Sequence, residues 1–222
     1  MRFSIEGHTA ATPDRITFKI RSGDTLINAL TLYEGGTVRL EKADTIVTNA
    51  TNVVRKADGT LGVRQYKVGD FAQGGIIFWI DETGEHGLVA DTADISTGIQ
   101  WYNGVKKVTN ATGDGVGSGE MNTMLIIAQQ TVDNMAGSFA ALLCANVRRG
   151  PYGDWYLPSK EELNMMYINL HLAGLGGFAG AYYWCSTEAS SSLVWIQAFA
   201  NGYQAFGDKE FSIPRVWAVR AF

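Results

Sequence analysis

The chain has 222 residues, a formal net charge of −4, 46% hydrophobic residues and 18% charged residues. This composition supports a folded core and excludes an intrinsically disordered chain, and the length fits one large domain or a mid-sized domain with an appendage. Nucleic acid is not an expected partner, because binding to a phosphate backbone needs a basic stripe and this chain is mildly acidic. The 26 glycines indicate a loop-rich fold that contains β-structure rather than a helical bundle.

No membrane insertion is expected, because no apolar run reaches the ~18 residues that a spanning helix needs. The start of the chain, Met1–His8, lacks the apolar stretch of a secretory signal, which favours assembly inside the cell over secretion. Cys144 and Cys185 are too few for a disulfide scaffold. We interpret them as two buried or half-buried free thiols, and a single pairing between them stays open as the alternative.

Residues 1–65 form a light segment without Trp or Cys. Ile16–Ile20 and Thr37–Leu40 alternate apolar and polar residues, which is the period of a half-buried strand. Turn signals separate such stretches at residues 22–24, 34–36 and 57–60. Because a segment with so few bulky side chains cannot easily bury its own faces, we predict a β-rich stalk or oligomerisation module. It would associate with copies of itself, with a trimer favoured.

Residues 66–222 contain all six tryptophans. Gly74–Ile80 and Leu88–Ala90, separated by a polar stretch with glycines, predict a hairpin whose first strand is covered on both faces. The periodicity predicts a helix over Gly119–Gln130. The face of this helix that we expect to be buried contains Met121, Leu125 and Ala128, with Met124, Ile127 and Val132 beside them.

A second helix is predicted to begin at Ser159, because Ser159 and Glu162 have the S-x-x-E spacing of a capping box. Its apolar face is expected to contain Leu163, Met166 and Tyr167. After Gly174 the chain becomes glycine-rich and then turns into short strand-like pieces that continue to the C-terminus. The predicted fold class of this part is therefore α+β, with a hairpin, two helices and a run of short strands.

The sequence contains no recognisable catalytic or metal-binding motif. The three histidines, His8, His86 and His171, have no second ligand at a suitable spacing, and the calcium pattern of an EF-hand is absent. Gly113–Gly119 lacks the Lys of a phosphate-binding loop, so we interpret it as a flexible surface loop before a helix. No nucleophile elbow is present. We therefore expect no enzyme activity, no catalytic residue, no metal and no cofactor.

Aromatic residues are concentrated in the second half of the chain. The stretch from Ala198 to Asp208 mixes aromatic side chains with small and polar ones and matches neither a clean strand nor a plain loop. Such a mixture is typical of binding surfaces, and it is also compatible with a large loop-rich core. The residues alone leave both interpretations open.

Four ordered stretches carry a resemblance to a known domain family. The central one is Asp154–Asn164, with the sequence DWYLPSKEELN, and the others are Gly74–Ile80, Tyr183–Glu188 and Val219–Phe222. Over residues 66–222 the chain resembles the C-type lectin-like domains of the formylglycine-generating-enzyme and Legionella collagen-like adhesin C-terminal type. The calcium-binding triplets of animal lectins are absent, so the resemblance does not imply Ca²⁺-dependent sugar binding.

The same fold serves the variable proteins of diversity-generating retroelements, such as phage tropism determinants, in which adenine-directed mutation changes exposed side chains. By this resemblance residues 182–222 form a variable region, where scaffold residues such as Trp184, Trp195 and Arg220 alternate with ligand-binding positions. Apolar residues at positions that are usually polar and exposed are explained by ligand selection more easily than by folding. The implied ligand-binding positions are Ala189, Ile196, Ala198, Ala200, Tyr203, Ala205, Phe206, Phe211, Ile213 and Trp217.

The resemblance implies a receptor-binding protein, such as a phage tail-fibre tip, that binds a host-cell surface protein or glycan. On this interpretation the protein belongs to a virion tail fibre, and the alternative is an adhesin on a bacterial cell surface. A second hypothesis, an oxidase of the formylglycine-generating type, requires Cys144 and Cys185 to be reactive and within disulfide reach. A third, a structural fibre protein without a ligand, predicts that the mixed C-terminal positions are buried. The main ligand contacts expected are Tyr203, Phe206, Phe211 and Trp217.

Overall fold

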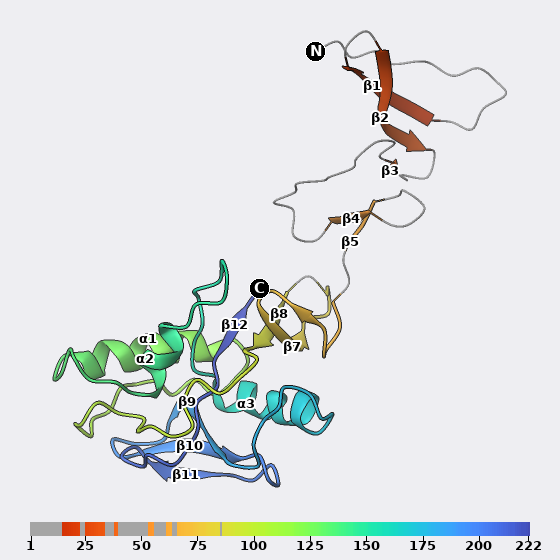
Figure 1. Ribbon diagram of the computed structural model, residues 1–222. Helices are drawn as coiled ribbons and strands as arrows, with labels where there is room; N and C mark the ends of the chain where they lie inside the picture. The colour runs from red at the N-terminus through yellow and green to blue at the C-terminus, as the bar shows by residue number, and fades with distance from the viewer. Residues whose placement is uncertain are drawn as a thin grey trace. The chain divides into compact units, whose positions relative to one another are not determined.

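A computed structural model gives the structure of the chain (Figure 1). The chain divides into two compact units, Met1–Gln65 and Tyr66–Phe222, and the boundary lies where the composition changes. The structure describes the backbone of the strands in the first unit, and residues 66–84 and 86–222 of the second. The strands of the first unit are β1 (Arg15–Ser22), β2 (Thr25–Tyr33), β3 (Val38–Arg39), β4 (Val53–Arg55) and β5 (Leu61–Val63).

In the first unit, β2 pairs antiparallel with β1 on one side and β3 on the other, and β4 and β5 form a separate hairpin. The strands predicted at Ile16–Ile20 and Thr37–Leu40 are confirmed. The sequence pattern does not predict β2, because its alternation breaks at Ala29. The register shifts there, since Leu30 and Asn28 pair with consecutive residues of β1 and leave Ala29 as the extra residue of a bulge.

The second unit is mixed α+β, with helices and two antiparallel sheets. The first sheet has the strand order β12–β8–β7–β6, with β6 (Phe71–Ala72), β7 (Gly75–Ile80), β8 (Gly87–Ala90) and β12 (Val219–Ala221). The second has the order β11–β10–β9, with β9 (Tyr182–Glu188), β10 (Leu193–Ala198) and β11 (Gln204–Asp208). The helices are α1 (Ser118–Thr131), α2 (Ala140–Ala145), α3 (Lys160–Met166) and the π-helical turn η1 (Tyr167–His171).

The predicted hairpin is confirmed as β7 and β8, which pair antiparallel. Ile77 of β7 belongs to one cluster of core residues and Phe78 to another, so the strand is covered on both faces as expected. The last strand, β12, pairs with β8. The end of the chain therefore lies beside the hairpin that begins the second unit (Figure 1).

The predicted capping box at the start of α3 is also confirmed. Ser159 Oγ accepts the backbone N–H of Glu162, and the Glu162 carboxylate accepts the Ser159 N–H at 2.7 Å. Leu163 and Met166 are buried on the apolar face. Each half of the box satisfies an N–H group that the first helical turn would otherwise leave without a partner.

The helix predicted over Gly119–Gln130 is present as α1, but only part of its expected apolar face contacts the core: Leu125 and Ile127 are half-buried against the first core cluster, and the other four residues are exposed. Met121 and Met124 are 57% and 51% exposed, and Ala128 and Val132 are exposed as well. The residues that α1 buries are Gly119, Asn122, Thr123, Ile126 and Gln130. The polar members of this set have partners inside the unit, because Asn122, for example, donates to the Gly113 carbonyl at 2.6 Å.

Two core clusters lie on opposite faces of the second sheet. Along β9, Trp184 belongs to the first cluster, and Tyr183 and Cys185 belong to the second. Gly207 of β11 allows close packing on the first face, because a Cβ there would lie 3.0 Å from Ile196 and 3.1 Å from Trp184. Both faces of β9 and β10 therefore serve the core along most of their length, and β11 is left at the rim of the sheet.

Candidate ligand-binding surface

The DWYLPS stretch is tied to the last strand of the unit by two sets of polar contacts. Asp154 forms a bidentate ion pair with Arg220 of β12, with oxygen–nitrogen distances of 2.7 and 2.8 Å. The Arg220 guanidinium holds the pKa of the Asp154 carboxyl below its ordinary value. Tyr156 and Val219 exchange both backbone hydrogen bonds, at 2.8 and 2.9 Å.

The other two stretches of the resemblance meet the same segment. The Ser186 N–H of β9 donates to the Pro158 carbonyl at 2.7 Å. Gly75 of β7 lies close beneath Trp155, since a Cβ at Gly75 would lie 3.2 Å from the indole ring. The motif residues therefore join the two sheets to each other, and folding alone accounts for them.

Glu162 is a fully buried carboxylate that connects the N-termini of α1 and α3. It accepts the N–H of Gly117, at the start of α1, and the N–H of Ser159, at the start of α3, both at 2.7 Å. Burial raises the pKa of Glu162, although these hydrogen bonds act in the opposite direction. The Gly-rich stretch is confirmed as a loop before a helix, and the N-terminus of α1 is occupied by the protein's own carboxylate.

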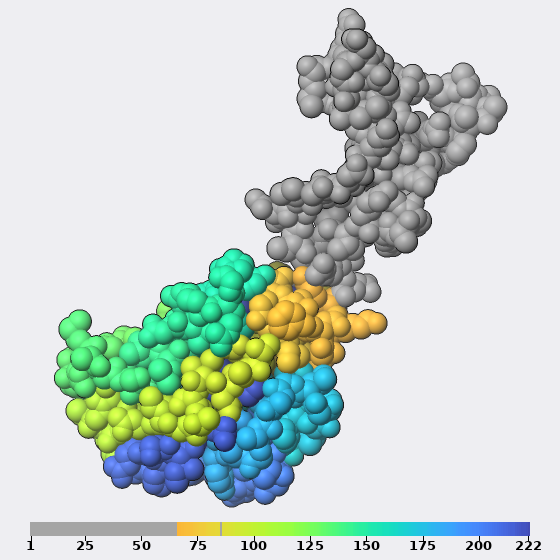
Figure 2. Space-filling view, viewed as in Figure 1, coloured from red at the N-terminus to blue at the C-terminus, as the bar shows by residue number. Residues whose placement is uncertain are grey.

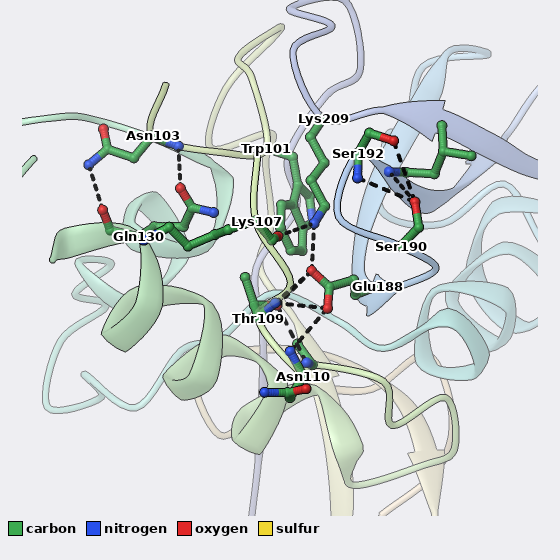
Figure 3. Close-up of polar contacts among 12 residues, drawn as sticks. Trp101, Asn103, Lys107, Thr109, Asn110, Gln130, Glu188, Ser190, Ser192 and Lys209 are labelled. Atoms are coloured by element: carbon green, nitrogen blue, oxygen red, sulfur yellow. Dashed lines mark hydrogen bonds and ion pairs between the residues drawn. The ribbon is translucent and has the colours of Figure 1, made fainter. Parts of the chain in front are cut away.

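A buried ion pair between Glu188 and Lys209 anchors the segment after β11 to the end of β9 (Figure 3). Lys209 Nζ lies 2.5 Å from Glu188 Oε1, and the two side chains are 0% and 1% exposed. Glu188 also accepts the backbone N–H groups of Thr109 and Asn110 at 2.9 and 3.0 Å, and Lys209 Nζ donates to the Lys107 carbonyl. Burial lowers the pKa of Lys209, and the neighbouring Glu188 carboxylate counteracts this.

Seven of the ten predicted ligand-binding residues are exposed or half-buried. Ala189 and Ala200 are exposed and Ala205 is half-buried. The segment that carries them lies on the surface of the second unit (blue in Figure 2). The hypothesis of a structural fibre without a ligand expects burial and disagrees with this exposure. Among the predicted residues, the large exposed ones are three aromatic residues and one isoleucine: Tyr203 (64% exposed), Phe206 (55%), Phe211 (48%) and Ile213 (76%). We call these four residues together the aromatic rim.

The other three predicted residues are buried, so their expected exposure is wrong. Ile196 and Ala198 of β10 are 8% and 6% exposed, because β10 lies between the two core clusters. Trp217 is 1% exposed, donates from its indole nitrogen to the Asp91 carbonyl at 2.9 Å, and has its ring centroid 4.1 Å from that of Phe178. Trp217 is a core residue, and it is removed from the set of expected ligand contacts.

Sequence reasoning missed two residues beside the aromatic rim, Trp195 and Lys160. Trp195 of β10 pairs across the strands with Phe206 of β11, and the ring centroids are 4.3 Å apart. Lys160 Nζ lies 3.9 Å from the centroid of the Trp195 ring, in a cation–π contact. Among the described residues no carboxylate is within ion-pair distance of Lys160 Nζ. The Trp195–Phe206 contact depends on the strand register and the Lys160–Trp195 contact on the packing of α3 near β10, and no local sequence pattern reveals either.

Cys144 and Cys185 are free and buried, which confirms their interpretation as two free thiols. They belong to different core clusters. Burial raises the pKa of both thiols, that of Cys185 to about 12, so neither is a thiolate near neutral pH. The raised pKa of both thiols does not match the reactive thiols that the oxidase hypothesis requires.

The two described histidines have ordinary surroundings. His86 is exposed next to the β7–β8 turn, and the His171 ring lies 5.5 Å from that of Tyr167, whereas His8 lies outside the described residues. In the described part of the chain, no three or more His, Cys, Asp or Glu side chains are grouped to hold a metal ion. Within the same residues, no helix is both long enough and apolar enough to cross a membrane.

No protein-family model matches the chain, and no curated protein matches it in sequence. Among solved structures, the chain is similar to a fimbrial protein from Bacteroides ovatus, with a TM-score of 0.44 and 13% sequence identity. The match covers 99% of this chain and 63% of the fimbrial protein, so the chain spans less than two thirds of that protein's length. A TM-score of this size does not establish a shared fold.

Proposed function

We propose that the chain is a ligand-binding protein whose second unit has a C-type lectin-like fold and binds a host-cell surface protein or glycan through the aromatic rim. The proposed setting is the tip of a phage tail fibre, or a variable protein of a diversity-generating retroelement. The convergence of the four motif stretches around Asp154–Glu162 supports the proposed fold, because it gives the stretches of the resemblance a common structural role.

The exposure of the aromatic rim is the observation that carries the proposal. Four large apolar side chains remain 48–76% exposed between positions 203 and 213, in a unit that buries most of its other aromatic residues. Their backbone is held by the pairing of β10 with β11 and by the Glu188–Lys209 ion pair. A surface that is already ordered loses little conformational entropy when a ligand binds, which favours affinity.

Ligand binding would gain its free energy mainly from burial of these side chains. Complete burial of one Phe-sized side chain is worth about 1.5–3 kcal/mol, and anchors of this kind carry most of the energy of known interfaces. Ile196 and Ala198 contribute by supporting the surface from inside, because Ile196 pairs with Ala205 and the Ala198 N–H donates to the Tyr203 carbonyl. The small exposed residues Ala189 and Ala200 leave room for a ligand to approach the backbone.

We further propose that the first unit oligomerises, with a trimer favoured, and so presents several copies of the second unit. This unit contains one small antiparallel sheet, β1–β2–β3, and one short hairpin, β4–β5. Association of copies would raise the apparent affinity of a weak single site by about 10²–10⁴, provided that the sites can be occupied together.

Binding of the labelled full chain to a panel of intact bacterial strains tests the proposal. The test variant is Tyr203→Ala/Phe206→Ala, and the matched control is Met121→Ala/Met124→Ala, which removes two comparably exposed side chains from α1. We expect the test variant to bind at least about 100-fold more weakly and the control to bind as the natural chain does. Equal binding by both variants, with folding confirmed by urea unfolding, would overturn the proposal.

The retroelement setting has a separate test in the gene. A near-copy of the codons for residues 182–222 that differs mainly at adenines, beside a reverse transcriptase gene, is the expected finding. Its absence from the genomic neighbourhood would contradict diversification and leave an ordinary fibre or adhesin surface.

A further inference from the structure

β11 forms an open edge of the second sheet, since among the described strands it pairs only with β10. An edge strand presents backbone N–H and C=O groups that have no partner within the sheet. Two backbone hydrogen bonds that flank the strand define the hydrogen-bonding pattern between β10 and β11. The Ala198 N–H donates to the Tyr203 carbonyl at one end, and the Lys209 N–H donates to the Ser192 carbonyl at the other. These bonded pairs fix which residues of β11 face β10 and which face the open edge.

Bonded and non-bonded pairs alternate along an antiparallel ladder. The pairs 197–204, 195–206 and 193–208 are therefore the non-bonded ones. The backbone groups of Gln204, Phe206 and Asp208 consequently point away from β10. The Asp208 carbonyl accepts the N–H of Phe211, so three N–H and two C=O groups remain directed toward the edge, at alternate residues along the strand.

β11 has little of the usual protection of an edge, apart from Lys106, whose ammonium pairs with the Asp208 carboxylate at the end of the strand. Its sequence, Gln-Ala-Phe-Gly-Asp, contains no Lys and no Pro, which are the residues that commonly prevent another strand from pairing. The exposed Phe206 ring lies on one face of the strand and contacts Trp195. Lys160 lies over Trp195 on the same face, and its ammonium has no carboxylate partner among the described residues.

We propose that β11 binds an extended segment of a partner protein by strand addition, and that this segment carries an acidic residue on the Phe206 face. This inference rests on the proposed function and specifies the chemistry of its ligand. A polypeptide in β conformation presents N–H and C=O groups at the same alternate spacing as Gln204, Phe206 and Asp208. Its side chains on the face of Phe206 pack against the exposed ring, and a carboxylate among them completes an ion pair with Lys160.

The Gln204 N–H offers a test that leaves the sheet intact. In Gln204→Pro the N–H that points to the edge is removed, and no hydrogen bond to β10 is lost, because this N–H is not used within the sheet. Gln204→Ala is the matched control, since it loses the same side-chain amide, which donates to the Lys160 carbonyl, but keeps the backbone N–H. Thermal unfolding of both variants verifies that they fold.

The probe is a set of 12-residue peptides selected from a phage-displayed random library on the immobilised full chain. We expect the selected peptides to be enriched in Asp and Glu, to bind Gln204→Ala within about threefold of the natural chain, and to bind Gln204→Pro at least about tenfold more weakly. Lys160→Gln is expected to weaken the acidic peptides while leaving their charge-neutral analogues unchanged.

Other outcomes overturn the inference. Failure to select any peptide, or equal binding by Gln204→Pro and Gln204→Ala, would contradict strand addition, and so would self-association of the chain that Gln204→Pro abolishes. Cell or glycan binding that is lost in Phe206→Ala but retained in Gln204→Pro would contradict strand addition and leave the proposed function standing. Binding that is retained in Tyr203→Ala/Phe206→Ala would contradict both.

Discussion

The segment Asp154–Glu162 and the rim around β11 have similar kinds of side chain and opposite environments. In the first, Asp154 pairs with Arg220, Trp155 is buried and Glu162 accepts hydrogen bonds from two helix starts. In the second, aromatic side chains stay exposed and alternate backbone groups face an open edge. The recognisable motif therefore forms the structural frame of the unit, whereas the proposed binding surface lies where side chains and backbone groups have no partners within the unit.

The largest expected difference in stability is between alanine variants of Trp217, a core residue, and Phe206, a residue of the aromatic rim. Trp217→Ala is expected to lower the free energy of unfolding by about 3–5 kcal/mol, because it removes a buried ring from the second core cluster. Phe206→Ala is expected to lower it by less than about 1 kcal/mol, because the Phe206 ring is 55% exposed. Urea unfolding of both variants measures the difference, and comparable losses would contradict the assignment of the two residues to frame and rim.

The buried Glu188–Lys209 ion pair, which holds the segment after β11 in place, can be removed by mutation. Lys209→Met leaves the Glu188 carboxylate buried without its cation, and we expect the free energy of unfolding to fall by about 3 kcal/mol. Lys106→Met, which affects an ion pair at the surface, is the control and is expected to cost much less, because solvent screens this pair. Two variants of equal stability in urea unfolding would contradict a buried anchor.

The frame has a pH-dependent element in the Asp154–Arg220 pair. The pKa of Asp154 is lowered from 3.8 by Arg220, so its contribution to stability is present above pH 3.8 and is lost as the pH falls through the lowered value. Asp154→Asn is expected to cost about 1 kcal/mol at pH 7, since Asp154 is itself 54% exposed. The difference between variant and natural chain should shrink below pH 3.8 in unfolding measured across this range, and a constant difference would contradict the pairing.

The smallest change in the free energy of unfolding is expected from substitutions on the outer face of α1. Met121→Ala and Met124→Ala should each change the free energy of unfolding by less than about 0.5 kcal/mol, because both side chains are more than half exposed. If the helix packed as its apolar periodicity predicts, each change would cost about 2–5 kcal/mol. Urea unfolding distinguishes the two packings of the helix directly.

Local features were predictable from the sequence where the determining contacts are close along the chain. The capping box of Ser159 and Glu162 needs only neighbouring residues, and the β7–β8 hairpin needs only a polar turn between two apolar stretches. The mixed α+β class follows from these elements. The bulge at Ala29 concealed β2, because one extra residue breaks the alternation from which a strand is inferred.

Features that depend on distant partners could not be predicted. Asn122 is buried in α1 because the Gly113 carbonyl and Ser186 are within reach, and nothing in the helical periodicity indicates this. Trp217 and Phe206 are both aromatic residues in the C-terminal segment, and only the packing of Trp217 against Phe178 separates core from surface. Sequence reasoning therefore predicted an exposed C-terminal segment, which is confirmed for seven of the ten residues, while the burial of Ile196, Ala198 and Trp217 required the structure. Ligand binding by this segment stays a proposal.

Site-specific photo-crosslinking shows whether the aromatic rim touches the ligand. A benzophenone amino acid is placed at position 206 of the full chain, or at position 121 as a control of similar exposure, and each chain is irradiated on a bacterial strain that it binds. We expect a crosslinked adduct with a cell-surface component from position 206 and none from position 121. Adducts from position 121 alone, or equal adducts from both positions, would contradict the aromatic rim as the ligand-binding surface.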